Sequence, residues 1–187
     1  MAAGSWLVFL GARDILESHF GQNSAARNFN TPLRASHSVR TRTPAIHSGD
    51  TVAKLSIPRL STQLYVIEGD DERELRRGPG HMPGTPMPGA RGNSVIAGHR
   101  DTHFRVLKDI RKGDDIVIET AAGQFLYRVK DTSIVPPSST SALQPSTGAT
   151  LHLITCYPFY YVGAAPQRFV VEARLAGEVT RVATRVE

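Results

Sequence analysis

Cysteine is almost absent from this chain, since Cys156 is the single thiol among 187 residues. One thiol cannot form an internal disulfide, and it cannot supply the cysteine pairs of a structural zinc site. The sequence also has no internal repeat and no low-complexity block. No group of Asp and Glu residues has the spacing of a calcium-binding loop. We therefore expect neither a metal ion nor another cofactor.

Long apolar runs are missing as well. A membrane-spanning helix needs about 20 apolar residues, whereas the start of this chain is apolar only until Arg13, Asp14 and Glu17 interrupt it. Three interpretations stay open for residues 1–20: the outer half of a membrane anchor whose upstream part is missing from this chain, an amphipathic helix at a membrane surface, or a fragment of a signal peptide. We favour the partial membrane anchor.

Acidic residues are absent between residues 21 and 49. This segment is rich in Ser, Thr and Asn, shows no periodicity, and contains Arg27, Arg34, Arg40 and Arg42. We predict a basic linker over residues 21–50, which could lie near anionic lipid. The remainder is only mildly basic within a net charge of +5, which argues against a nucleic-acid partner.

From residue 51 to 176 the sequence alternates between strand and turn patterns. Twelve prolines and sixteen glycines favour many turns. We predict strands at residues 51–57, 62–69, 93–99, 114–120, 123–135, 149–156 and 168–175. Short helices are predicted at residues 70–78, 104–110 and 141–144, a long Gly/Pro-rich loop at 80–92, and a C-terminal tail at 177–187. About eight strands with only short helices indicate an all-β fold that closes into a barrel.

Cys156 ends one of the predicted strands. Alternation puts Leu151, Leu153 and Thr155 on one face and His152, Ile154 and Cys156 on the other. In the strand that follows, Phe169 and every second residue after it form the expected core face, so Arg168 leads the opposite face. If the two strands pair, Cys156 and Arg168 point into the same surface. The alternative is that Cys156 is simply a small buried hydrophobe.

A reactive thiol also needs a proton partner, for which histidine is the usual choice. The candidates are His81, His99, His103 and His152. His152 lies on the same strand as Cys156 at about 13 Å along an extended chain, which is too far. His99 ends a predicted strand and is placed to face a groove, and His103 is an alternative if the following loop folds back.

Four segments together resemble the sortases, the cysteine transpeptidases of bacterial surfaces. "NSVIAGHRDTHFRVLKDIRKGD", "LHLITCYPF" and "APQRFVVEARL" resemble their three signature segments, and "GPGHMPGTPMPGARGN" fits the loop before the histidine. The resemblance covers Thr51 to Leu175, the segments follow one another in the same order as in the family, and their residues are most similar to those of class D. It implies a closed eight-stranded β-barrel that recognises a C-terminal sorting signal of the Leu-Pro-x-Thr-Gly type.

The resemblance also implies roles for individual residues. Cys156 would be the nucleophile, His99 the general acid and base, and Arg168 the group that holds the substrate or the oxyanion. The backbone N–H of Tyr157 would help to form the oxyanion hole. Ile154, Tyr157 and Tyr160 would line the substrate groove, with the alternative that these aromatic residues only pack the loop.

The partners implied by the resemblance are sorted proteins, an amine of the cell envelope, and a membrane that the N-terminus contacts. The expected location is the cytoplasmic membrane, with the catalytic domain on its extracytoplasmic side. Two other functions stay open: a hydrolytic cysteine endopeptidase acting on the same signal, and a non-catalytic β-barrel binding module.

Overall fold

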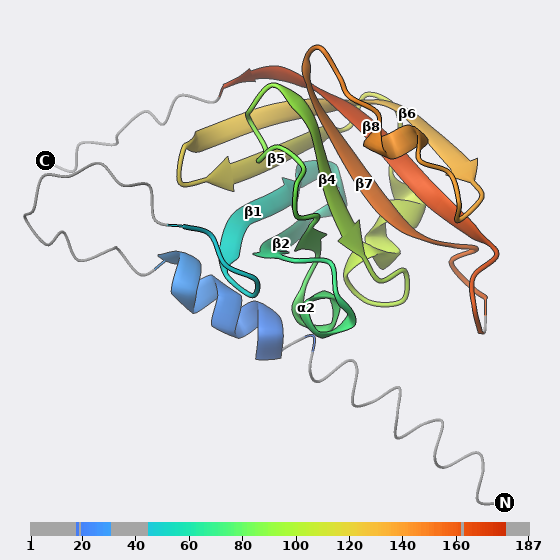
Figure 1. Cartoon of the computed structure of the whole chain (residues 1–187), viewed down its shortest axis with the longest axis horizontal. Helices are drawn as coiled ribbons and strands as arrows, with labels where there is room; N and C mark the ends of the chain where they lie inside the picture. Colours follow the sequence, from blue (N-terminus) through green and yellow to red (C-terminus); the bar gives the residue numbers. More distant parts are fainter. Residues whose placement is uncertain (1–17, 19, 31–44, 162, 179–187) are drawn as a thin grey trace, which may run out of the picture.

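A computed structural model describes residue 18 and residues 20–30, 45–161 and 163–178 of the chain. Its centre is a closed barrel of eight strands with the order β1-β2-β3-β4-β7-β8-β6-β5 (Figure 1). The strands are β1 (Thr51–Ile57), β2 (Thr62–Glu68), β3 (Gly80–His81), β4 (Gly92–Gly98), β5 (Asp115–Thr120), β6 (Gly123–Val135), β7 (Ala149–Tyr157) and β8 (Gln167–Glu178). The predicted closed eight-stranded barrel is confirmed.

Helices in the described residues are short. They comprise α2 (Glu72–Arg77), the 3-10 helices η1 (Pro58–Leu60), η2 (His103–Asp109) and η3 (Ser141–Leu143), and an N-terminal helix that we define by residue 18 and residues 20–30. Nowhere in this described part does a helix combine the length and the apolar character that crossing a bilayer requires.

Strand direction determines which loops meet at the ends of the barrel. β4 and β7 are parallel neighbours, so both end at the same end of the barrel (Figure 1). β7 and β8 are antiparallel, so β8 begins where β7 ends. The loop after β4, the end of β7 and the start of β8 therefore lie together, although they are distant in the sequence.

The barrel interior is filled by alternate side chains of the strands. Leu151 and Leu153 of β7, together with Val171 and Ala173 of β8, have no solvent exposure. Tyr127 also lies in this core, and its hydroxyl accepts a hydrogen bond of 2.8 Å from the N–H of Gly89, which anchors the Gly/Pro-rich loop. The faces predicted for the last two strands are those observed.

Most predicted bounds differ from the structure by a residue or two, and two differences are larger. β3 lies inside the segment predicted as a loop. Its two residues pair with β2 on one side and β4 on the other, and two residues are too few to show an alternating pattern in the sequence. β8 continues to Glu178, past the predicted boundary at residue 176. The predicted tail lies, from residue 179 onward, outside the described residues.

The largest correction concerns the predicted linker over residues 21–50. Residues 20–30 form a helix that packs on the barrel beside α2 (Figure 1). Gln22 makes hydrogen bonds to the backbone of Tyr65 and Arg77, Ala25 is fully buried, and the Phe29 ring lies 5.9 Å from that of Tyr65. Tertiary contacts stabilise a helix here that lacks a strong apolar period.

Candidate active site

Cys156 and Arg168 are direct cross-strand partners in the β7–β8 ladder. Directly opposed residues of an antiparallel pair project to the same face, with Cβ atoms about 4.5–5.5 Å apart. Both residues are half-buried. The pairing predicted for these two strands is therefore observed, and it sets the backbone of Arg168 directly beside that of Cys156.

The neighbouring ladder brings His99 to the same row. Gly98 of β4 pairs with Thr155 of β7, and His99 and Cys156 are the residues that follow them. The buried hydroxyl of Thr155 donates a 2.6 Å hydrogen bond to the carbonyl oxygen of Gly98. His99 is one residue past the last pair of the β4–β7 ladder. Because neighbouring strands lie about 4.8 Å apart, its backbone lies near that of Cys156, which pairs with Arg168; we call these three backbone positions the row.

Cys156 belongs to the outer face of the barrel. Thr155 on its inner side is only 2% exposed, whereas Cys156 keeps intermediate exposure. The row behind it on the same face consists of Ala97, Ile154 and Val170, which are register neighbours. The sulfur is therefore not sealed in the core, and Ile154 lies on an apolar surface adjoining it.

Among the candidate histidines, His99 is partly exposed and lies near a carboxylate. Its side chain is 29% exposed, and its Nε2 atom lies 3.8 Å from the Oε1 atom of Glu72 in α2. That separation permits an ion pair when the imidazole is protonated. The imidazole of His99 is thus accessible to solvent or a ligand, while its backbone lies next to the Cys156 strand.

His81 and His152 are engaged elsewhere. His81 is buried in β3, with Nδ1 2.7 Å from the Glu68 carboxylate. His152 has Nδ1 2.5 Å from the Oδ1 atom of Asn93, and burial lowers the pKa of His152. Neither residue shares the row that contains Cys156.

His103 lies at the start of η2 and is also buried. Its Nε2 atom is 2.7 Å from the hydroxyl of Ser18 in the N-terminal helix, and its Nδ1 atom is 3.3 Å from the hydroxyl of Thr102. Burial, together with the charge of nearby His99, lowers the pKa of His103 to about 4. His103 is therefore neutral near pH 7 and suited to holding the loop.

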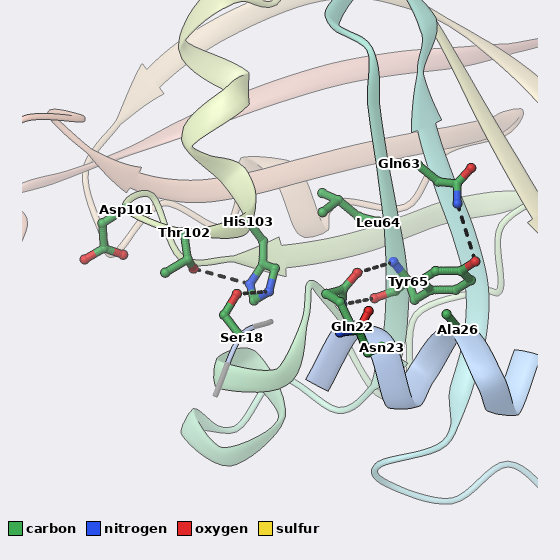
Figure 2. Close-up of a pocket in the computed structure, with 10 residues that line it drawn as sticks. All are labelled: Ser18, Gln22, Asn23, Ala26, Gln63, Leu64, Tyr65, Asp101, Thr102 and His103. Carbon is green, nitrogen blue, oxygen red and sulfur yellow. Dashed lines mark hydrogen bonds between the residues drawn. The ribbon is translucent and has the colours of Figure 1, made fainter. Parts of the chain in front are cut away.

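A hollow of about 560 Å³ opens between the N-terminal helix and the loop that follows His99. Figure 2 shows Asp101, Thr102 and His103 on one side of it and Ser18 and Gln22 on the other. The wall also includes part of β2. Cys156 and Arg168 are not among the lining residues, so this hollow adjoins the histidine loop and not the thiol.

The Arg168 side chain is held by the loop that precedes it. Its Nη1 atom donates hydrogen bonds to the carbonyl oxygens of Ala165 and Gln167, at 3.3 and 3.0 Å. These contacts hold the guanidinium at the start of β8. A guanidinium retains its positive charge at any physiological pH.

The aromatic residues after Cys156 divide into two groups. The Tyr157 ring packs with Phe159 and Phe169, with ring centroids 5.3–6.3 Å apart across the cluster. Tyr160 is 73% exposed, and its hydroxyl accepts a hydrogen bond from Lys108. Packing against Phe159 and Phe169 thus holds the ring of Tyr157, whereas the side chain of Tyr160 is held by its hydrogen bond with the ammonium group of Lys108.

Several contacts of this region were not predicted from the sequence. Arg100, which follows His99, donates hydrogen bonds to the carbonyl oxygens of Tyr161 and Gly163. The guanidinium of Arg105 lies 5.6 Å from the Tyr160 ring centroid. The only signal in the sequence is that basic residues follow the histidine and tyrosines follow the cysteine.

The described residues contain no cluster of three or more His, Cys, Asp or Glu side chains arranged to hold a metal ion. The chemistry available in the row is that of a thiol, an imidazole and a guanidinium. Such a set suits nucleophilic attack on a carbonyl, proton transfer and stabilisation of negative charge.

Comparisons with known proteins agree with this geometry. Residues 55–176 match the protein-family model described as the sortase domain. Sortase D of Bacillus subtilis is 37% identical over 125 residues, which cover 66% of this chain and 63% of that protein. The chain thus spans less than two thirds of the length of that relative.

Solved structures give the same result. A Clostridium perfringens sortase D5 transpeptidase superposes with a TM-score of 0.70 at 27% identity, covering 86% of this chain and 99% of that one. Sortase E1 of Streptomyces coelicolor, with a tripeptide in its active site, gives a TM-score of 0.64 at 29% identity, covering 76% and 98% respectively.

Proposed function

The chain belongs to the sortase family, and on this premise we propose that it is a cysteine transpeptidase. It cleaves a C-terminal sorting signal of the Leu-Pro-x-Thr-Gly type and transfers the acyl group to an amine of the cell envelope. The observation that carries the proposal is the strand register, which pairs Cys156 with Arg168 and ends, on the β4 side, one residue before His99.

In the first half-reaction the thiolate of Cys156 attacks the carbonyl carbon of the scissile Thr–Gly bond. A carbon–sulfur bond forms, and the carbon–nitrogen bond to the leaving glycine breaks. The imidazolium of His99 donates its proton to the departing amine.

In the second half-reaction an envelope amine attacks the thioester carbon, and its proton passes to the neutral imidazole of His99. A new amide bond forms while the carbon–sulfur bond breaks and returns the thiolate. His99 ends protonated, as it began, so one residue serves as acid and then as base. The buried, neutral His103 does not take this role.

Arg168 stabilises the oxyanion or holds the peptide carbonyl, a role that its pairing with Cys156 across the β7–β8 ladder supports. The backbone N–H of Tyr157 is the proposed second donor. Ile154 and Tyr160 line the peptide groove, Ile154 through the apolar row behind Cys156. The tripeptide in the active site of the Streptomyces coelicolor sortase supports a peptide ligand here.

We place the enzyme at the cytoplasmic membrane, with the catalytic domain on the extracytoplasmic side. The apolar start of the chain supports a tether over residues 1–20. Most of this segment lies outside the described residues. Family membership supports the envelope location, because sorted proteins and amine acceptors are expected there.

The proposal is tested with the purified chain and a fluorescent peptide carrying a Leu-Pro-x-Thr-Gly motif varied at x, with triglycine as the amine. We expect intact-mass spectrometry to detect an acyl adduct on Cys156 and chromatography to detect a triglycine conjugate. Cys156→Ala should form neither product. Hydrolysis without a conjugate at saturating triglycine would instead favour a cysteine endopeptidase, and absence of any adduct across the motif set would overturn the proposal.

A further inference from the structure

The loop between β7 and β8 carries little apolar burial of its own. Phe159 packs against the core, but from Tyr160 to Gln167 every described residue except Ala165 is exposed. Gly163 adds backbone freedom at a φ of +102°. A segment with few buried contacts needs other interactions to keep one position.

Cationic side chains from the region after His99 supply those interactions. Arg100 donates to the carbonyl oxygens of Tyr161 and Gly163 at 2.7 and 3.0 Å, and its guanidinium lies 5.8 Å from the Tyr161 ring centroid. Lys108 donates to the Tyr160 hydroxyl at 3.0 Å. We call this set, Arg100, Arg105 and Lys108 with Tyr160 and Tyr161, the cation–tyrosine clasp.

The basic side of the clasp stands on a rigid support. Phe104 and Leu107 of η2 are fully buried, and a Cβ atom at Gly98 would lie 2.6 Å from the Phe104 ring. The N–H of Phe104 donates a 2.9 Å hydrogen bond to the carbonyl oxygen of His99. The clasp therefore connects the loop after Cys156 to the element that holds the backbone of His99.

From this geometry we propose that the clasp determines how the acyl-enzyme partitions between amine and water, an inference that rests on the proposed function. Water is present at high concentration, so it can hydrolyse a thioester without being held in a particular orientation. An amine acceptor depends on an oriented approach beside His99, and on a wall that limits solvent. Releasing the loop should therefore slow transfer more than hydrolysis. Arg100 and Lys108 act as positioning residues.

The test measures the ratio of triglycine conjugate to hydrolysed peptide in Arg100→Gln and Lys108→Met. We expect this ratio to fall roughly tenfold in Arg100→Gln, equivalent to about 1.4 kcal/mol. Arg100→Lys keeps the charge and should recover part of the ratio. Tyr160→Phe keeps the ring but removes the hydroxyl, and should resemble Lys108→Met in a weaker form.

Arg91→Gln is the matched control. Arg91 also donates to a loop carbonyl, that of Thr147 at 3.1 Å, but it precedes β4 and so lies at the opposite end of that strand from His99. Its ratio should equal that of the wild type. This control shows whether a change in the ratio comes from loss of the clasp, or would follow the loss of any arginine that holds a loop.

Hydrogen exchange of residues 158–166 provides a readout that does not depend on activity. Exchange should accelerate in Arg100→Gln while the barrel strands remain protected. Unchanged exchange, or faster exchange with an unchanged ratio, would overturn the inference and leave the proposed function standing. Absence of an acyl adduct in the wild type would overturn the proposed function, and the inference with it.

Discussion

The hydroxyl of Thr155 donates a 2.6 Å hydrogen bond to the carbonyl oxygen of Gly98, 57 residues away in the sequence. The bond joins the parallel strands β4 and β7, and the residues that come directly after Gly98 and Thr155 are His99 and Cys156. Both groups are buried, so the bond is protected from competition with water. It therefore helps to hold the backbone just before His99 against the backbone just before Cys156.

Thr155→Val should weaken this alignment. The substitution conserves shape but removes the donor, and we expect a loss of about 1 kcal/mol in the free energy of unfolding with a lower kcat. Thr150→Val is the control, because Thr150 is also buried on β7 and its hydroxyl lies 2.7 Å from that of Ser146, at the far end of the strand. Urea unfolding and peptide turnover measure the two effects. Equal losses of kcat in both variants would contradict the alignment role.

Arg168→Lys should impair acylation even though the charge is retained. A lysine loses the planar donor fork, and loss of an oxyanion donor costs about 100-fold or more in kcat. Arg174→Lys changes a second arginine on β8, which contacts Glu172 and is exposed, and should stay near wild-type activity. Stopped-flow measurement of acyl-enzyme formation separates the two. Wild-type acylation by Arg168→Lys would argue against the assigned role.

The buried His103 should make stability depend on pH. Its pKa is about 4 in the folded protein and 6.5 when exposed, so the unfolded chain binds the proton first as the pH falls. The free energy of unfolding should therefore decrease between pH 6.5 and 4, with His103 contributing up to about 3 kcal/mol. In His103→Gln this part of the decrease should vanish.

His47→Gln serves as the control for the pH experiment, because His47 is exposed. Its stability curve should follow the wild type across the same pH range. His152, whose pKa burial also lowers, leaves a residual decrease in both variants. If His103→Gln retained the full wild-type slope, His103 would not be the neutral buried group described above.

Gln22 should contribute to stability from outside the barrel. Its side chain accepts a hydrogen bond from the N–H of Tyr65 and donates to the carbonyl oxygens of Tyr65 and Arg77. We expect Gln22→Ala to lower the free energy of unfolding by about 1–3 kcal/mol. Asn28→Ala, at an exposed position of the same helix, should change it little. A wild-type melting curve for Gln22→Ala would show that the helix does not dock in solution.

Local patterns predicted most of the barrel. β1 and β6 have the predicted bounds, and the inner face of β7 follows the alternation of Leu151, Leu153 and Thr155. Alternation is readable because each strand has one face against the core. β3 escaped prediction, since two residues are too few to show a period.

The N-terminal helix escaped prediction for a different reason. Its buried contacts are a glycine against the backbone of Arg77, an alanine and a glutamine that bonds to main chain. None of these residues forms the apolar stripe by which an amphipathic helix is recognised. Its docking depends on the surface that β2 and α2 present.

The sequence by itself determined that Cys156 lies near the end of a strand, on the face opposite the core, and that Arg168 lies near the start of the next strand, on the matching face. Which residues can be buried in a strand is local information. Only the tertiary structure decided that β4 runs parallel to β7 and ends beside Thr155, one residue before His99. It also decided that Arg100 and Lys108 reach the loop after Cys156. Those contacts join residues that are distant in the sequence, so they depend on how the whole chain folds, and they produce no periodic pattern in the sequence.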